Sequence, residues 1–105
     1  MLTQDAAIGI VRNYVRDMKE FGVHLRAVFL YGSFAKGTQR EWSDIDVALV
    51  ADEFTGLPED CNLFPYMGCI RKSYTLIEAK TYPTEYFLQG DPYIEEITKT
   101  GIKII

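Results

Sequence analysis

Two acidic residues at alternate positions are the first feature of this sequence that could do chemistry. Asp44 and Asp46 stand at the start of the apolar run IDVALV, which predicts a buried strand over residues 45–50. Side chains at positions i and i+2 of a strand share a face, so both carboxylates point the same way. Two like charges on one face need a compensating cation, and carboxylate oxygens suit Mg²⁺. The pair is a candidate magnesium site; the alternative is two polar residues at a fraying strand end.

A glycine and a serine upstream of this pair form a candidate phosphate site. Gly32 directly follows the β-prone run RAVFLY, and Ser33 stands where a short helix is expected to begin. Glycine lets another group approach the backbone closely. The first N–H groups of a helix, together with the serine hydroxyl, can hold an anion. The alternative is a strand-to-helix turn capped by serine.

The two patterns together are more specific than either one alone. A phosphate site after one strand and a carboxylate pair at the start of the next would bring a triphosphate and a metal ion together, as nucleotidyl transfer requires. A third carboxylate normally assists. Glu78 is the candidate because it lies in the run TLIEA, within a third predicted strand over residues 73–79. The alternative for Glu78 is a strand-end glutamate that points to water.

The elements that position these residues follow from the spacing of apolar side chains. Ile8, Val11, Val15 and Met18 recur at helical spacing and predict an amphipathic helix over residues 4–21. Further segments are a strand over 26–31, a short helix after Ser33, a strand over 45–50, loop and short helical pieces over 52–72, a strand over 73–79, short helices near 83–87 and from Pro92, and a final short strand, IKII. This order predicts one α/β (α+β) domain over residues 1–105, with a small mixed sheet flanked by helices.

The composition excludes several classes of protein. The 105 residues make one domain's worth of sequence, and a content of 48% hydrophobic and 13% aromatic residues requires a packed core. Eleven Lys and Arg against 15 Asp and Glu give a net charge of −4, which disfavours a nucleic-acid binder because phosphate neutralisation needs a basic face. No apolar run approaches the roughly 18 residues that cross a membrane, and the first residues do not resemble a signal peptide. A cytoplasmic protein is therefore expected.

The cysteines and the histidine do not suggest a metal or nucleophile site. Cys61 and Cys69 form no CxxC pair and no Cys/His cluster, which argues against zinc and favours reduced thiols. His24 lies between a predicted helix and a predicted strand with no nucleophile motif nearby, so we interpret it as a turn histidine.

The run GSFAKG followed by SDIDVALV resembles the signature of the DNA polymerase β-like nucleotidyltransferase superfamily. The short chain also looks like a minimal nucleotidyltransferase (MNT) of the kind encoded beside HEPN-domain toxins. The resemblance is strong over residues 26–50 and loose in the second half. It implies the polymerase β-like fold and two sets of site residues. Those that would bind the phosphates of ATP are Gly32, Ser33 and Lys36, and those that would hold Mg²⁺ are Asp44, Asp46 and Glu78. Lys36 stands where the family often has Arg, which keeps the charge but loses the bidentate fork.

The resemblance also implies a reaction. AMP would pass from ATP to a hydroxyl group, expected to be a tyrosine of a partner HEPN toxin, so that the protein would act as an antitoxin. The alternatives are an antitoxin that neutralises its partner by contact alone, a small-molecule nucleotidyltransferase, and a polymerase-like enzyme, which the acidic composition disfavours. Five aromatic residues could contact a partner or belong to the core: Tyr66, Tyr82, Tyr86, Phe87 and Tyr93.

Overall fold

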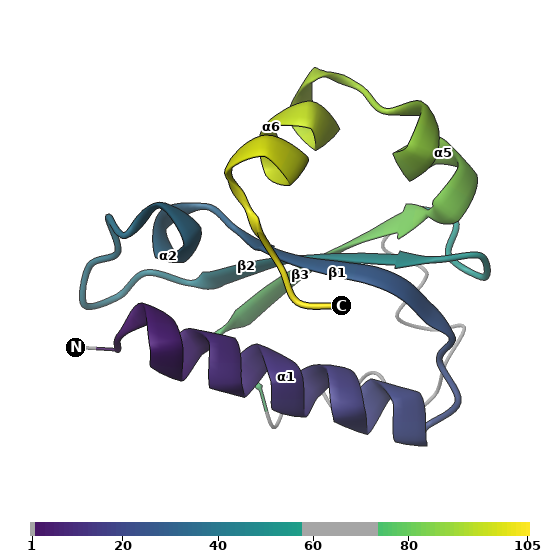
Figure 1. The fold of residues 1–105 in the computed structure, drawn as a ribbon. Coiled ribbons are helices and arrows are strands. Elements are labelled where there is room, and N and C mark those ends of the chain that lie inside the picture. Colours follow the sequence, from purple (N-terminus) through teal and green to yellow (C-terminus); the bar gives the residue numbers. More distant parts are fainter. Residues whose placement is uncertain (1, 58–73) are drawn as a thin grey trace.

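A computed structural model describes residues 2–57 and 74–105, and Figure 1 shows their arrangement. In chain order the elements are α1 (Gln4–Glu20), β1 (Leu25–Tyr31), α2 (Ser33–Lys36), β2 (Ile45–Ala51), β3 (Ile77–Pro83), α5 (Thr84–Gln89), α6 (Pro92–Thr100) and β4 (Ile102–Lys103). The strands of these residues form one sheet in the order β3-β2-β1-β4. β1 is antiparallel to β2 and β4, whereas β2 is parallel to β3. The predicted small mixed sheet flanked by helices is thus confirmed.

Helix α1 covers one face of the sheet. Thr3 caps its start, because the Thr3 hydroxyl accepts a hydrogen bond from the N–H of Ala6 at 3.1 Å. The buried stripe of α1 packs against the odd-numbered residues of β2 and the even-numbered residues of β1. This core includes Val11, Tyr14, Val15, Met18, Val28, Leu30, Ile45, Val47 and Leu49.

Helices α5 and α6 cover the opposite face (Figure 1). There Ala48 and Val50 of β2 pack in a second core with Phe87, Ile94 and Ile97. β2 is consequently buried on both faces, which explains why it is apolar at nearly every position. Asp46 precedes Ala48 on the face that α5 and α6 cover, so it lies at the start of β2 on that side of the sheet.

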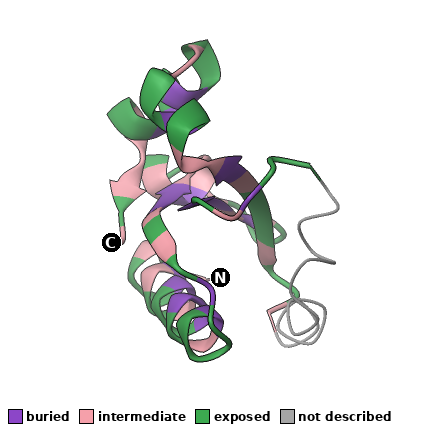
Figure 2. Cartoon of the chain, turned by 90° about the vertical axis from the view of Figure 1, so that its right-hand side faces the viewer, coloured by how far each residue is buried: buried purple, intermediate pink, exposed green. Residues whose placement is uncertain are grey.

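The third strand differs from the prediction in its position. It runs from Ile77 to Pro83 instead of over residues 73–79. Tyr74 instead packs on the α1 side of the sheet, where its hydroxyl donates a hydrogen bond to Oδ2 of Asp17 at 2.5 Å. The chain then turns into β3, and the N–H of Ile77 donates to the carbonyl of Tyr74 in this turn. β3 is a largely exposed edge strand (Figure 2), so its polar residues obscured the apolar signal that marks a strand.

The remaining predictions for the middle of the chain lie outside the described residues. These concern most of the loop and helical pieces expected over 52–72, together with Cys61, Tyr66 and Cys69. Among the described residues, no helix is long and apolar enough to cross a membrane.

Candidate functional site

The glycine turn and the second aspartate meet directly. Tyr31, the last residue of β1, is the register partner of Asp46 on β2, and Gly32 follows at once. Gly32 adopts φ 75° and ψ −150°, a conformation essentially restricted to glycine. A Cβ atom at Gly32 would lie 3.2 Å from Cγ of Asp46 and closer still to its Oδ2. Backbone conformation and the neighbouring carboxylate therefore both require glycine here.

The single helical turn that follows Gly32 is anchored on both sides. Ser33 begins α2, and the N–H of Lys36 donates to the carbonyl of Gly32 at 3.1 Å. Phe34 is buried in the α1 core. The side-chain amide of Gln4 in α1 donates to the carbonyls of Phe34 and Ala35 at 2.9 and 3.2 Å. α2 is thereby held beside Asp46 with its first N–H groups at the Gly32–Ser33 turn, where no intrahelical partner exists for them.

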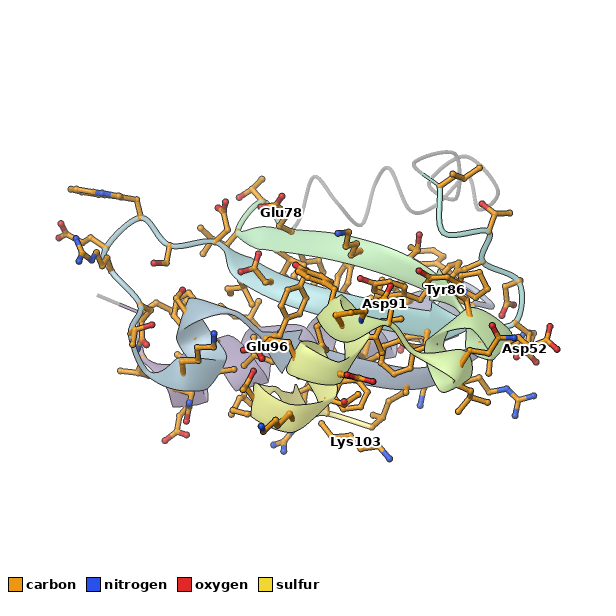
Figure 3. All side chains as sticks on the ribbon, turned by 90° about the horizontal axis from the view of Figure 1, so that it is seen from above. Asp52, Glu78, Tyr86, Asp91, Glu96 and Lys103 are labelled. Carbon is orange, nitrogen blue, oxygen red and sulfur yellow. The ribbon has the colours of Figure 1, made fainter. Side chains whose placement is uncertain are left out.

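The third carboxylate is brought to the same place by strand pairing. Glu78 is the register partner of Asp46 in the parallel β2–β3 pair, so the two side chains share a face. The N–H of Ile45, between the two aspartates, donates to the carbonyl of Leu76 at 2.8 Å and ties this end of β2 to β3. Burial raises the pKa of Asp46, and the charges of Glu78 and Asp44 raise it further. Glu78 is exposed at the start of the edge strand (Figure 3), yet its charge acts on Asp46.

These carboxylates fit Mg²⁺ bound together with phosphates. Within residues 2–57 and 74–105, no three His, Cys, Asp or Glu side chains lie close enough together to hold a metal ion. Mg²⁺, however, is usually held by one or two carboxylates, with substrate phosphates and water completing its shell. A divalent cation would also offset the repulsion that raises the pKa of Asp46. The assignment of Asp44, Asp46 and Glu78 as ligands stays a prediction.

A cavity of about 220 Å³ lies beside Gly32 and Asp46. It is lined by Tyr31, Gly32, Lys36, Asp46, Tyr93, Glu96, Ile97 and Thr100. Lys36 reaches it from α2 and forms an ion pair with Glu96 of α6, with 3.4 Å between Nζ and Oε1. The predicted phosphate-binding residue Lys36 is thus close to Gly32 and Asp46, although a carboxylate of this chain already pairs with it.

Sequence reasoning missed the contribution of α6 and of Tyr31. The α6 residues that line the cavity recur at spacings of three and four, so they form one helical face: Tyr93, Glu96, Ile97 and Thr100. This face could be found from the sequence, but not the fact that it lies over Asp46. The pKa of Tyr31 lies far above its usual value because of burial, a hydrogen bond with Tyr93 and the charge of Asp46. Tyr31 lines the cavity beside Asp46, its register partner.

The aromatic candidates for partner contact separate into two groups. Tyr82 and Phe87 are buried in the second core, as the core alternative supposes. Tyr86 and Tyr93 are 47% and 49% exposed, so they are available at the surface. Tyr66 is outside the described residues.

A larger hollow among the described residues is remote from this site. It measures about 800 Å³ and lies at the other end of the sheet, between the end of α1, the start of β1 and the residues that follow β2. Its lining includes Lys19, Val23 and Asp52. His24 lies there, in the turn before β1 as interpreted from the sequence, with its Nδ1 3.1 Å from Oε2 of Glu53. The Arg26–Asp52 ion pair is nearby, and Figure 3 shows Asp52 at the opposite end of the sheet from Glu78. The residues that line this hollow include charged pairs, but neither Gly32 nor Asp46 is among them, so the hollow is not part of the candidate site.

In the presence of a metal chelator, Asp46→Asn is expected to change the pH dependence of stability. Because the pKa of Asp46 is raised in the folded protein, its charged form destabilises the fold at neutral pH, and this effect vanishes as the pH falls through the raised pKa toward the ordinary value of 3.8. The variant should therefore be more stable than wild type at neutral pH and lose that advantage in acid. Urea unfolding in EDTA across this range measures the difference. If the difference in free energy of unfolding between wild type and Asp46→Asn did not vary with pH, the raised pKa of Asp46 and its cause, burial beside two other carboxylates, would be contradicted.

Comparison with known proteins places the fold. The family model described as "Polymerase beta, Nucleotidyltransferase" matches residues 17–105. A chain from the crystal structure of a toxin–antitoxin with AMP-PNP superimposes with a TM-score of 0.60 at 18% identity, over 93% of this chain and 72% of that one. At this identity the likeness shows the shared fold alone. No match is found among curated proteins.

Proposed function

Because the chain belongs to the polymerase β nucleotidyltransferase family, we propose that it transfers AMP from Mg²⁺–ATP to a hydroxyl group of a partner protein. The observation that carries the proposal is the contact between Gly32 and the carboxylate of Asp46. It puts a backbone turn that suits phosphate against a carboxylate that suits a divalent cation. Nucleotidyl transfer needs those two functions side by side.

The residues of the site take distinct roles in this reaction. The N–H groups at Gly32 and Ser33 would bind the β- and γ-phosphates, and Lys36 would exchange its contact with Glu96 for a phosphate oxygen. The carboxylates of Asp46 and Asp44 would hold the cation together with the phosphates, and Glu78 would lie beside them, since among the described residues no three such side chains are close enough to hold one ion. Magnesium bound there would neutralise the charge that develops on the phosphates and align the triphosphate.

The bond changes are those of an in-line displacement. The acceptor oxygen attacks the α-phosphorus, and the bond from that phosphorus to the bridging oxygen of the β-phosphate breaks. Pyrophosphate leaves with the electron pair of the broken bond. The hydroxyl proton passes to a base. We assign this role to Glu78, which its register with Asp46 and its exposure support.

The acceptor that we propose is a tyrosine of a HEPN-domain toxin in the cytoplasm. A solved structure with the same fold is a toxin–antitoxin with AMP-PNP, which supports a toxin as partner. Two exposed aromatic residues near the site residues suit a protein contact. Trp42, just ahead of Asp44, is 84% exposed, and Tyr93 at the rim of the cavity is half-exposed.

Neutralisation by contact alone is the second candidate function. It is favoured by the lack of a cluster of three metal-ligating side chains among the residues that the structure describes. Under this alternative the same aromatic surface binds the toxin, and the carboxylates do no chemistry.

Labelled ATP separates the two functions. The protein is incubated with Mg²⁺, a HEPN-domain toxin as the proposed partner, and ATP labelled at either the α- or the γ-phosphate. We expect the α-label on the toxin, no γ-label, and labelled pyrophosphate only from γ-labelled ATP. Loss of toxin activity without label on the toxin would contradict transfer and support neutralisation by contact.

Lys36→Ala is expected to weaken binding of Mg²⁺–ATP by roughly tenfold or more, since a hydrogen bond to a charged group is lost. The free energy of unfolding should change by less than about 1 kcal/mol, because Lys36 and Glu96 are both exposed and exposed ion pairs contribute little. Calorimetric titration and urea unfolding measure the two quantities. Glu96→Gln is the matched control, which removes the competing carboxylate and should not weaken binding. Unchanged ATP affinity in Lys36→Ala would remove Lys36 from the site.

A further inference from the structure

A second cavity, of about 390 Å³, adjoins the site on the same face of the sheet. Its walls include Lys80 and Tyr82 of β3, Tyr86 of α5, and Asp91 and Tyr93 at the start of α6. Tyr93 lines both this cavity and the one that contains Gly32 and Asp46. The two cavities are therefore neighbours across one tyrosine ring.

The strand spacing sets how far the second cavity lies from the carboxylates. Lys80 and Tyr82 follow Glu78 at alternate positions of β3, so all three share a face. At about 3.3 Å per residue, Lys80 lies roughly 7 Å and Tyr82 roughly 13 Å along the strand from Glu78. A ribose and base extending from an α-phosphate at the carboxylates would reach this stretch of β3.

Tyr82 and Tyr86 form an aromatic wall of the second cavity, and contacts within the protein hold this wall in place. The ring of Tyr86 is parallel to that of Tyr82, with an angle of 6° between the planes and 6.4 Å between the centroids. The hydroxyl of Tyr86 donates to Oδ2 of Asp91 at 2.6 Å, while Oδ1 of Asp91 accepts the N–H of Ile94 at 2.7 Å as the cap of α6. Figure 3 shows Tyr86 and Asp91 beside each other. The half-exposed ring of Tyr86 is thus fixed before any ligand binds, which lowers the entropy lost on binding.

Lys80 brings a cation to the second cavity, beside the tyrosine that lines both cavities. The ammonium of Lys80 lies 4.5 Å from the centroid of the Tyr93 ring. This position is on the path from the carboxylates to the aromatic wall. There the ammonium can donate hydrogen bonds to the acceptor oxygens of a ribose or of an α-phosphate.

We propose that the second cavity binds the base of the nucleotide, stacked on the Tyr86 ring, while the phosphates lie at Gly32. The inference rests on the proposed function and names the part of ATP that the first cavity cannot hold. The volume suits a small planar ligand, and aromatic rings bind bases of any kind through their π-faces. An acceptor tyrosine fits this position less well, since its oxygen must reach the α-phosphorus at the carboxylates and not the far end of the aromatic wall.

Two titrations of the same variants test the inference. Mg²⁺–ATP and Mg²⁺–tripolyphosphate, which has no base, are titrated into wild type, Tyr86→Ala and Tyr86→Phe. Tyr86→Ala should weaken ATP binding by roughly 10- to 100-fold and leave tripolyphosphate binding within about twofold, and Tyr86→Phe should retain most of the ATP affinity because it keeps the ring. Leu88→Ala, on the same helix and 80% exposed, is the control and should change neither.

The outcomes separate this inference from the proposed function. Equal ATP affinity in wild type and Tyr86→Ala would overturn the inference alone, as would an equal loss for ATP and tripolyphosphate. A wild-type protein that binds neither ligand, even with the partner toxin present, would overturn both. Adenosine added to wild-type protein gives a readout without any variant: amide NMR signals of Lys80, Tyr86 and Tyr93 should shift. Shifts confined to other residues, or shifts at these three with a tyrosine peptide but not with adenosine, would overturn the base assignment.

Discussion

Asp46→Asn is expected to lower the rate of AMP transfer by at least roughly 10²- to 10³-fold, the loss that follows removal of one group that stabilises charge in an active site. The amide is nearly the same size as the carboxylate, so the contact with Gly32 is kept and the fold remains intact. What is lost is the negative charge on the residue that lies between the glycine turn and Glu78. Initial rates at saturating ATP, Mg²⁺ and partner measure the effect.

Asp52→Asn is the matched control for this prediction. Asp52 follows the other end of β2, where it forms an exposed ion pair with Arg26 at 2.8 Å. The same change of carboxylate to amide there should leave the transfer rate within about twofold, because the exposed pair contributes little. Transfer by Asp46→Asn within about tenfold of wild type would show that this carboxylate is not needed for the chemistry.

Gly32→Ala is expected to reduce both stability and transfer. The backbone at φ 75° and ψ −150° would cost an alanine about 1–3 kcal/mol. The added Cβ would also collide with the carboxylate of Asp46, which must move away from its position beside the turn. Since a misplacement of about 1 Å in an active site can reduce the rate roughly 100-fold, a loss of that order is expected.

Gly37→Ala separates backbone strain from the contact with Asp46. Gly37 ends α2 in the left-handed region at φ 73° and ψ 20°, and a Cβ there meets nothing within 4 Å. This variant should lose about 1–2 kcal/mol of stability, similar to Gly32→Ala, but keep its transfer rate when corrected for the folded fraction. Urea unfolding and initial rates give both quantities. Equal transfer rates for the two folded variants would show that the contact between Gly32 and Asp46 does not determine activity.

The elements with strong local signals could be predicted from the sequence. The apolar stripe of the first helix gave residues 4–21, and the structure has Gln4–Glu20. The Asp91-Pro92 start of the last helix was recognisable because aspartate is a preferred cap and proline suits the first turn. Helical periodicity and helix caps depend only on residues that are close in the sequence, so one sequence is enough to predict these helices.

The site was predictable only in its local parts. The pairing of Asp46 with Glu78 depends on the register of two parallel strands, which no local pattern specifies. The predicted third strand was displaced because the edge strand carries polar residues on both faces. Glu96 was missed, and Tyr93 was considered only for partner contact or the core, for a similar reason: both residues reach the cavity only through the packing of α6 over β1 and β2.

Calorimetric titration of the wild-type protein with ATP, first with Mg²⁺ and then with excess EDTA, tests most directly whether the turn and the carboxylates form one nucleotide site. Binding with Mg²⁺ that is lost in EDTA, and lost again in Asp46→Asn with Mg²⁺, is the predicted result. Binding of equal strength in Mg²⁺ and EDTA would contradict a metal-dependent site at Asp46. So would failure to bind Mg²⁺–ATP even when the partner toxin is present.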